Sequence, residues 1–211
     1  MLLKNSGGAL LLRAGQRVYV AGSNAHDMAN QVGGWTVSWQ GPSGPTISGR
    51  TILDGIRTAA KGARVTHSVD ASAPTEGHDV GVVAVGEAPY AEGFGDVGNN
   101  GHDLELTEAD RKAVDRVCGT MRCVVLVVFG RPQMIAEQLP AMDALVASWL
   151  PGSEGDGVTD VLYGKRPFTG KLPLSWPRSA DQGQVNVGDR GYDPLFPYGF
   201  GLTVRGPQPG R

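Results

Sequence analysis

The sequence predicts an α/β fold: a three-layer α/β sandwich whose mostly parallel sheet, of about six strands, carries helices on both faces. The runs typical of strands are continuously apolar, as expected when both faces of a strand are covered. Segments with helical periodicity lie between these runs. The 211 residues, 40% of them hydrophobic, are enough for one core, so we treat residues 1–211 as a single domain.

The first predicted strand covers residues 17–22, and a helix follows over residues 51–62. Its apolar residues share one face, and Gly62 suits the position of a C-terminal cap. Those apolar residues are Ile52, Leu53, Ile56, Ala59 and Ala60. A weaker strand is predicted over residues 63–69, and a strong one over residues 80–86.

The second predicted helix covers residues 107–119. Thr107 and Asp110 form a pair resembling a capping box at its start. Its apolar stripe consists of Ala109, Ala113, Val114 and Val117.

Two more strands are predicted over residues 123–130 and 143–150, and a third helix over residues 153–164. Ser153 is expected to cap this helix, and its inward-facing residues are expected to be Val158, Val161 and Leu162. From about Lys171 the chain is rich in proline, glycine and aromatic residues. We therefore expect residues 171–211 to form an irregular wrap around the domain.

Composition argues against several classes of partner. The 19 basic and 21 acidic residues give a formal charge of −2, which favours neither nucleic acid nor an anionic membrane surface. No apolar stretch approaches the roughly 18 residues of a membrane span. The segment MLLKNSGGALLLRAG has only a short apolar run broken by glycine, so no signal peptide is recognised.

A metal site is not expected either. The four histidines, His26, His67, His78 and His102, are scattered without a ligand spacing. Cys118 and Cys123 enclose only the segment GTMR. Such a short loop can hold a disulfide at a turn from helix to strand, whereas a reducing compartment would leave two free thiols.

A ligand is expected beyond the carboxyl ends of the strands, as in other open α/β sheets. The loop after strand 17–22 contains Trp35 and Trp39, and the loop after strand 80–86 contains Glu87, Glu92 and Asp96. Aromatic rings beside carboxyl groups are typical of carbohydrate chemistry, because a sugar ring stacks on indole while a carboxyl group acts on the glycosidic oxygen. A nucleotide site is the weaker interpretation, since neither GxGxxG nor GxxxxGK[ST] occurs.

Several segments resemble the C-terminal α/β-sandwich domain of glycoside hydrolase family 3, in its β-glucosidase and exo-β-glucan glucohydrolase branch. These segments follow one another along the chain in the same order as in the family. They cover nearly the whole chain, and WLPGSEG, GKLPLSWP and PYGFGLT are the most specific. The others are VYVAGSNAHDMANQVGGWTVSWQG, TILDGIRTA, VGEAPYAEGFGD, LTEAD and VCGTMRCVVLVVFGRP.

The resemblance implies a shared active site. A barrel domain supplies the nucleophilic Asp, and a loop of this domain supplies the general acid/base. The second glutamate of GEAPYAE, Glu92, matches that acid/base, with Glu87 as the alternative. Trp39 is expected to stack on the sugar in the leaving-group subsite and Trp35 to brace the loop. Asp96 is expected to order the loop, and Cys118 and Cys123 match a disulfide-forming pair.

No barrel and no SDW-like nucleophile segment occur in these 211 residues. The opening MLLKN corresponds to the stretch after the interdomain linker of the family, so the chain is a fragment or a free-standing domain. Its expected partners are a β-glucoside or β-glucan oligosaccharide and a family 3 barrel domain, in cis or in trans, with no cofactor. The alternative is a non-catalytic module that binds carbohydrate or only docks onto a barrel. The resemblance and the cysteine pair favour a periplasmic or secreted location.

Overall fold

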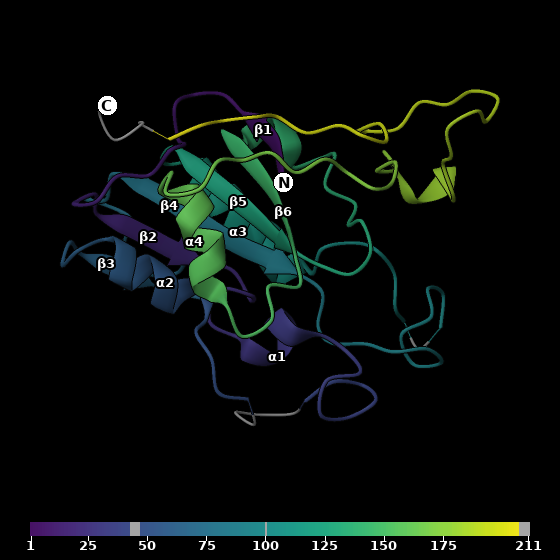
Figure 1. Ribbon diagram of the computed structural model, residues 1–211, viewed down its shortest axis with the longest axis horizontal. Helices are drawn as coiled ribbons and strands as arrows, with labels where there is room; N and C mark the ends of the chain where they lie inside the picture. Colours follow the sequence, from purple (N-terminus) through teal and green to yellow (C-terminus); the bar gives the residue numbers. More distant parts are fainter. Residues whose placement is uncertain (43–46, 100, 207–211) are drawn as a thin grey trace.

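The computed structural model describes residues 1–42, 47–99 and 101–206 and confirms the predicted fold class. In this part of the chain, six strands form one sheet in the order β1-β6-β5-β4-β2-β3. All neighbouring strands are parallel except β1 and β6, which are antiparallel (Figure 1). The strands are β1 (Leu2–Asn5), β2 (Val18–Ala21), β3 (Val65–His67), β4 (Val80–Gly86), β5 (Cys123–Val128) and β6 (Ala144–Trp149).

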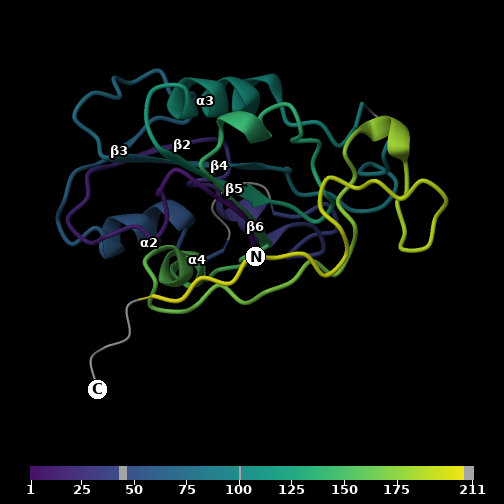
Figure 2. The same ribbon diagram turned by 90° about the horizontal axis from the view of Figure 1, so that it is seen from above.

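Helices cover both faces of this sheet, which makes the three layers visible in Figure 2. Helix α3 (Glu108–Cys118) packs on one face, and α2 (Ile52–Ala59) and α4 (Gly155–Leu162) pack on the other. Successive residues of a strand point to opposite faces. On β4, accordingly, Val83 and Val85 join the core beneath α3, while Val82 and Ala84 join the core beneath α2 and α4.

Strand β1 is an element that the sequence pattern did not predict. Its four residues are too few to show a period, and its partner β6 lies about 140 residues further along the chain. It forms an antiparallel edge, with Leu2 opposite Val146 and Asn5 opposite Ala144. A short helix, α1 (Met28–Val32), also lies in a segment that we interpreted as a loop.

The start of α2 shows a complete capping box that the sequence analysis did not name. Thr51 accepts a hydrogen bond from the Asp54 backbone, and the Asp54 carboxylate accepts one from the Thr51 backbone. The expected cap at Gly62 was wrong. The helix already ends at Ala59 with Ala60 as its C-cap, and Gly62 belongs to the following turn.

The predicted apolar stripe of helix α3 was wrong at one position. Ala109 is exposed, and the buried position beside it belongs to Asp110. Thr107 caps the Asp110 backbone N–H as expected, but the Asp110 carboxylate accepts hydrogen bonds from the backbone and hydroxyl of Ser23. Only half of the predicted capping box therefore forms, because the Asp110 carboxylate is engaged by another loop.

At α4 the predicted cap, Ser153, was wrong. The N-cap is Glu154, which makes no side-chain capping bond, and Ser153 donates instead to the Glu154 carboxylate. A neighbouring loop supplies a backbone cap, since the Arg50 carbonyl accepts from the Gly155 N–H. Val158 and Leu162 are buried as expected, and Val161 is half-buried.

The segment after residue 171 contains little regular structure, with one short 3₁₀ helix, Ala180–Gln182. The first and last parts of residues 165–206 run along the β1 side of the sheet, and the part between them, with the short 3₁₀ helix, extends away from it (Figure 1). Isolated bridges join Leu202 to Leu2 and Phe168 to Val204. The Trp176 side chain is fully buried and donates its indole N–H to the Gln133 carbonyl. This part of the tail therefore belongs to the core beside α3.

Candidate active site

Two loops extend beyond the carboxyl ends of the central strands (Figure 1). Their described residues are 22–42 and 47–51, which follow β2 and include α1, and 87–99 and 101–107, which follow β4. We name residues 87–96 the acid/base loop, after the role expected for Glu92, and residues 33–41 the tryptophan loop, after Trp35 and Trp39.

The two loops approach each other closely at two glycines of the tryptophan loop. A Cβ atom on Gly34 would lie 1.8 Å from the Tyr90 carbonyl oxygen, and one on Gly41 would lie 2.4 Å from the Pro89 side chain. Glycine is therefore required at both contacts, because any side chain would push the loops apart. Gln40 adds a link that the sequence analysis missed: its amide oxygen accepts from the Ala91 N–H at 2.9 Å. The tryptophan loop is thus held against the residue preceding Glu92.

Glu92 lies on the open surface and forms a direct bond to the tryptophan loop. The indole N–H of Trp35 donates to its carboxylate oxygen Oε2 at 3.0 Å. The backbone N–H of Glu92 and the Trp35 indole lower the pKa of this carboxyl, and the Trp39 indole acts in the same direction. The surroundings of Glu92 in this chain therefore favour its charged carboxylate form.

Trp35 and Trp39 form an exposed aromatic pair beside Glu92. Their ring centroids are 6.5 Å apart with the planes inclined at 53°, and the side chains are 68% and 46% exposed. The single N–H of the Trp35 indole donates to Glu92, so the ring is oriented by the carboxylate. Val37, Phe94 and Val97 add exposed apolar side chains on the same two loops or directly beyond them.

Glu87 has a different environment, although it lies only five positions earlier. Its side chain is 9% exposed. Oxygen Oε1 accepts from Nε and Nη2 of Arg131 at 3.0 and 2.7 Å, and Oε2 accepts from the backbone N–H groups of Gly130 and Arg131. All of these donors come from the segment after β5. The carboxylate is fully engaged and points into the protein.

Asp96 lies in the exposed part of the acid/base loop. Its backbone N–H donates to the Gly93 carbonyl, and its own carbonyl accepts from the Asn99 N–H. These bonds form consecutive turns after Glu92.

Asp110 is the buried carboxylate of this end of the sheet. It holds Ser23, directly after β2, through the Ser23 backbone N–H at 3.0 Å and hydroxyl at 2.7 Å. Burial raises the pKa of the Asp110 carboxyl, and the bonds from Ser23 oppose this shift. It ties α3 to the base of the loop that carries the tryptophans.

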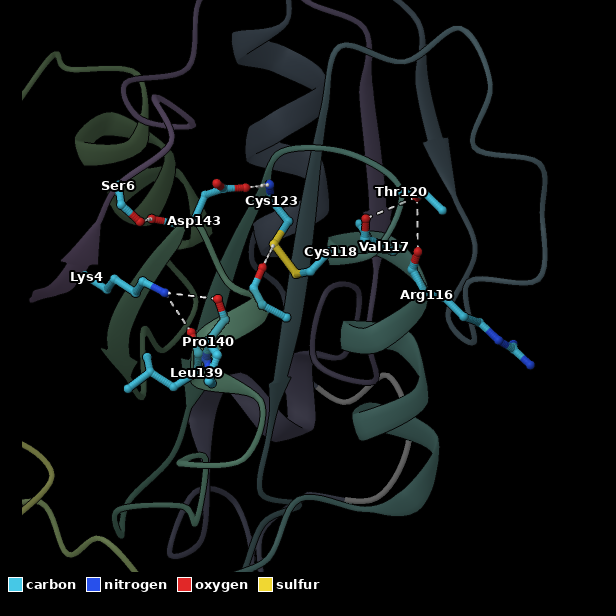
Figure 3. The surroundings of a disulfide bond; sticks show 11 residues. Lys4, Ser6, Arg116, Val117, Cys118, Thr120, Cys123, Leu139, Pro140 and Asp143 are labelled. Carbon is cyan, nitrogen blue, oxygen red and sulfur yellow. Dashed lines mark hydrogen bonds between the residues drawn. A yellow bond between two sulfur atoms is a disulfide. The ribbon is translucent and has the colours of Figure 1, made fainter.

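Cys118 and Cys123 form a disulfide that joins the end of α3 to the start of β5 (Figure 3). Cys123 also donates its backbone N–H to the Asp143 carboxylate at 2.9 Å. Cys123 begins β5 at its amino end, so the disulfide lies at the end of the sheet opposite the two loops.

The described residues contain no group of three or more His, Cys, Asp or Glu side chains arranged to hold a metal ion. In the same part of the chain, no helix combines the length and the apolarity needed to cross a bilayer.

The three-layer fold is shared with solved glycoside hydrolases, since an exo-1,3/1,4-β-glucanase matches 98% of this chain with a TM-score of 0.86. The family model described as "Glycosyl hydrolase family 3 C-terminal domain" matches residues 1–204. The chain therefore belongs to glycosyl hydrolase family 3 as its C-terminal domain, which confirms the resemblance seen in the sequence.

Three similar proteins show how far the likeness extends. A solved exo-1,3/1,4-β-glucanase from a Pseudoalteromonas species, ExoP, is 38% identical, with a TM-score of 0.86 over 98% of this chain and 35% of its own. The lysosomal β-glucosidase of Dictyostelium discoideum is 30% identical and the periplasmic β-glucosidase of Salmonella typhimurium 26%, each over 96% of this chain. The chain spans only 28% and 33% of the lengths of these two relatives.

Proposed function

We propose that this chain is the acid/base-supplying domain of a retaining β-glucosidase or exo-β-glucanase that removes terminal β-D-glucosyl residues. Glu92 protonates the leaving glycosidic oxygen. It then takes a proton from the water that hydrolyses the glycosyl-enzyme intermediate. The nucleophile is an Asp of the barrel domain, in cis or in trans. The names of the relatives support the reaction class, since they are β-glucosidases and an exo-β-glucanase.

The observation that carries the proposal is the contrast between the two glutamates. Glu92 is exposed and bonded to one of two exposed tryptophans. The Glu87 side chain is only 9% exposed, and its carboxylate is occupied by four hydrogen bonds. A general acid must approach the glycosidic oxygen within about 3 Å, which favours Glu92.

The pKa of Glu92 is lowered in this chain, so the partner domain must raise it before Glu92 can act as a general acid. A general acid has to be protonated before the first step, whereas the present surroundings favour the carboxylate. Covering the loop with a second domain would remove water, and the nucleophilic carboxylate about 5–5.5 Å away would add repulsion. Both effects raise the pKa of a carboxyl group. We therefore expect the pKa of Glu92 to rise when the active site is assembled.

The exposed apolar side chains around Glu92 support docking of such a partner. Five of them lie on the tryptophan loop, on the acid/base loop or at residue 97: Trp35, Val37, Trp39, Phe94 and Val97. A cluster of this kind is typical of a surface that another domain or a ligand covers. The same cluster also suits the alternative function, a non-catalytic module that binds β-glucosides through Trp39 and Trp35 or only docks onto a barrel.

The kinetics of a two-domain enzyme containing this chain separate these functions. In Glu92→Ala, hydrolysis of a disaccharide should fall by about 10²–10⁴-fold, because its leaving group needs protonation. An activated aryl β-glucoside should lose much less at the glycosylation step. Glu87→Gln serves as the matched carboxylate variant and should show at most a small difference between the two substrates. Equal loss on both substrates in Glu92→Ala would support the non-catalytic module.

The chain without a barrel should show no more than trace activity on an aryl β-glucoside. A retaining mechanism needs two carboxyl groups on opposite sides of the bond, and only one is proposed here. Efficient turnover by the pure chain, abolished in Glu92→Gln, would contradict the division of the active site between two domains.

A further inference from the structure

Arg131 makes the contacts that hold the acid/base loop in place. It lies three residues after β5, with its side chain 22% exposed. Its guanidinium donates to the Glu87 carboxylate, at the start of the loop, and through Nη1 to the Gly95 carbonyl, near the end of the loop. Between these points, the guanidinium carbon lies 3.6 Å from the centroid of the Tyr90 ring. One side chain therefore contacts the loop on both sides of Glu92.

These contacts are tightly packed. A Cβ atom on Gly130 would lie 2.4 Å from the Tyr90 hydroxyl, so the Tyr90 ring lies directly against the segment that carries Arg131. Stacking over an aromatic ring and a fork of donors toward a carboxylate are both properties of arginine that lysine does not reproduce. The ion pair between Arg131 and Glu87 is mostly buried, so water and salt screen it less than they screen an exposed ion pair.

The loop needs such support because its own composition is flexible. Gly93 and Gly95 follow Glu92 closely, and glycine loses more conformational freedom on ordering than any other residue. A general acid displaced by about 1 Å loses up to 10²-fold in rate. The observed contacts hold the Glu87 carboxylate, the Tyr90 ring and the Gly95 carbonyl, and they leave Glu92 between them at the surface.

We infer that Arg131 is a positioning residue for Glu92: its guanidinium, paired with Glu87, stacked on Tyr90 and bonded to Gly95, sets the place of the acid/base in the assembled active site. The inference rests on the proposed function. It also gives the buried Glu87 a role, as the anion that orients Arg131.

The first test uses this chain alone. Amide hydrogen exchange across residues 87–99 should be at least about tenfold faster in Arg131→Met, because the loop opens more often. A ¹³C NMR titration should show the pKa of Glu92 shifted upward, toward its ordinary value, as the Trp35 bond loosens. Arg131→Lys should lie between Arg131→Met and the native chain. Arg17→Met is the matched control: it breaks an exposed pair with Asp79 before β2, at the other end of the sheet, and should change neither measurement.

The second test uses the two-domain enzyme. In Arg131→Met, kcat/KM for a disaccharide should fall by about 10–100-fold, and that for an activated aryl glucoside by less than about threefold. Where Arg131→Met does not fold, Arg131→Lys carries the same test with a smaller ratio between the two substrates. Unchanged exchange, or equal losses on both substrates, would overturn the inference.

Failure of the two proposals can be told apart. If Glu92→Gln in the same enzyme shows no leaving-group dependence, the proposed function fails, and the exchange experiment still decides whether Arg131 orders the loop. If Glu92→Gln shows that dependence and Arg131→Met does not, only the inference about Arg131 fails.

Discussion

The hydrogen bond from the Trp35 indole to Glu92 places an aromatic side chain and the proposed acid/base in one unit. It has two consequences. The ring of Trp35 is oriented by the carboxylate, and the carboxylate is held in its charged form. Trp35 thus braces Glu92, and we propose that Trp39, whose ring centroid is 6.5 Å away, is the ring that contacts a sugar.

Replacing Trp35 by phenylalanine tests this unit. The variant keeps an aromatic ring and removes the N–H, so the pKa of Glu92 should rise relative to the native chain. The direction of this change follows from the lowered pKa of Glu92. The hydrogen bond from Trp35 stabilises the Glu92 carboxylate at neutral pH, and this stabilisation is lost as the pH falls through the pKa of Glu92 in the folded protein. A ¹³C NMR titration of the Glu92 carboxyl measures the midpoint. Identical midpoints in the two proteins would show that the indole bond has no effect on the carboxyl.

Some of the candidate site was predictable from sequence, residue by residue. Glu92 and the tryptophans lie in loops that follow strands, and the carboxyl ends of parallel strands meet at one edge of the sheet. Arg131 and Gln40 were not predicted, because their partners lie 44 and 51 residues away in the sequence. The segment GRP after β5 was recognised as the end of VCGTMRCVVLVVFGRP, a stretch that resembles the family. No local pattern shows that its arginine reaches Glu87.

Among the elements, β4 was predicted with its observed bounds, 80–86, because a continuous run such as VGVVAVG occurs where both faces of a strand are buried. The errors fall at element ends. The Asp110 carboxylate was expected to complete a capping box with Thr107, but it accepts a hydrogen bond from Ser23. Helix α4 was expected to be capped by Ser153, but the Arg50 carbonyl accepts from its first N–H group. Tertiary contacts replace the local partner in both cases. Strand β1 exists only through its pairing with β6, which a four-residue pattern does not reveal.

The disulfide between α3 and β5 gives a prediction at this scale. Reducing Cys118–Cys123 should lower the free energy of unfolding by about 2 kcal/mol, since the closed loop is very short. Because the bond lies at the opposite end of the sheet, loop 87–96 should keep its hydrogen exchange rates. Denaturant unfolding with and without reductant measures the difference. Two alkylatable thiols in non-reduced, natively secreted protein would show that the bond does not form in the cell.

At the scale of the whole molecule, we propose that the chain is one half of a divided active site. It provides an exposed carboxyl group and aromatic rings on loops fixed to a rigid sheet, and it spans 35% of ExoP. The three layers followed from the sequence pattern. The packing of the tail did not: Trp176 is fully buried among residues of the core beside α3, although its segment has no regular period.

The most direct measurement of the central claim is product analysis of a two-domain Glu92→Ala enzyme supplied with an activated aryl β-glucoside and sodium azide. Azide needs no general base, so it attacks the anomeric carbon of the glycosyl-enzyme and releases the carboxylate of the barrel nucleophile. We predict faster turnover with azide and β-glucosyl azide as the product, identified by NMR, with neither result in Glu87→Ala. Azide rescue in Glu87→Ala, together with a nearly silent Glu92→Ala, would contradict the account.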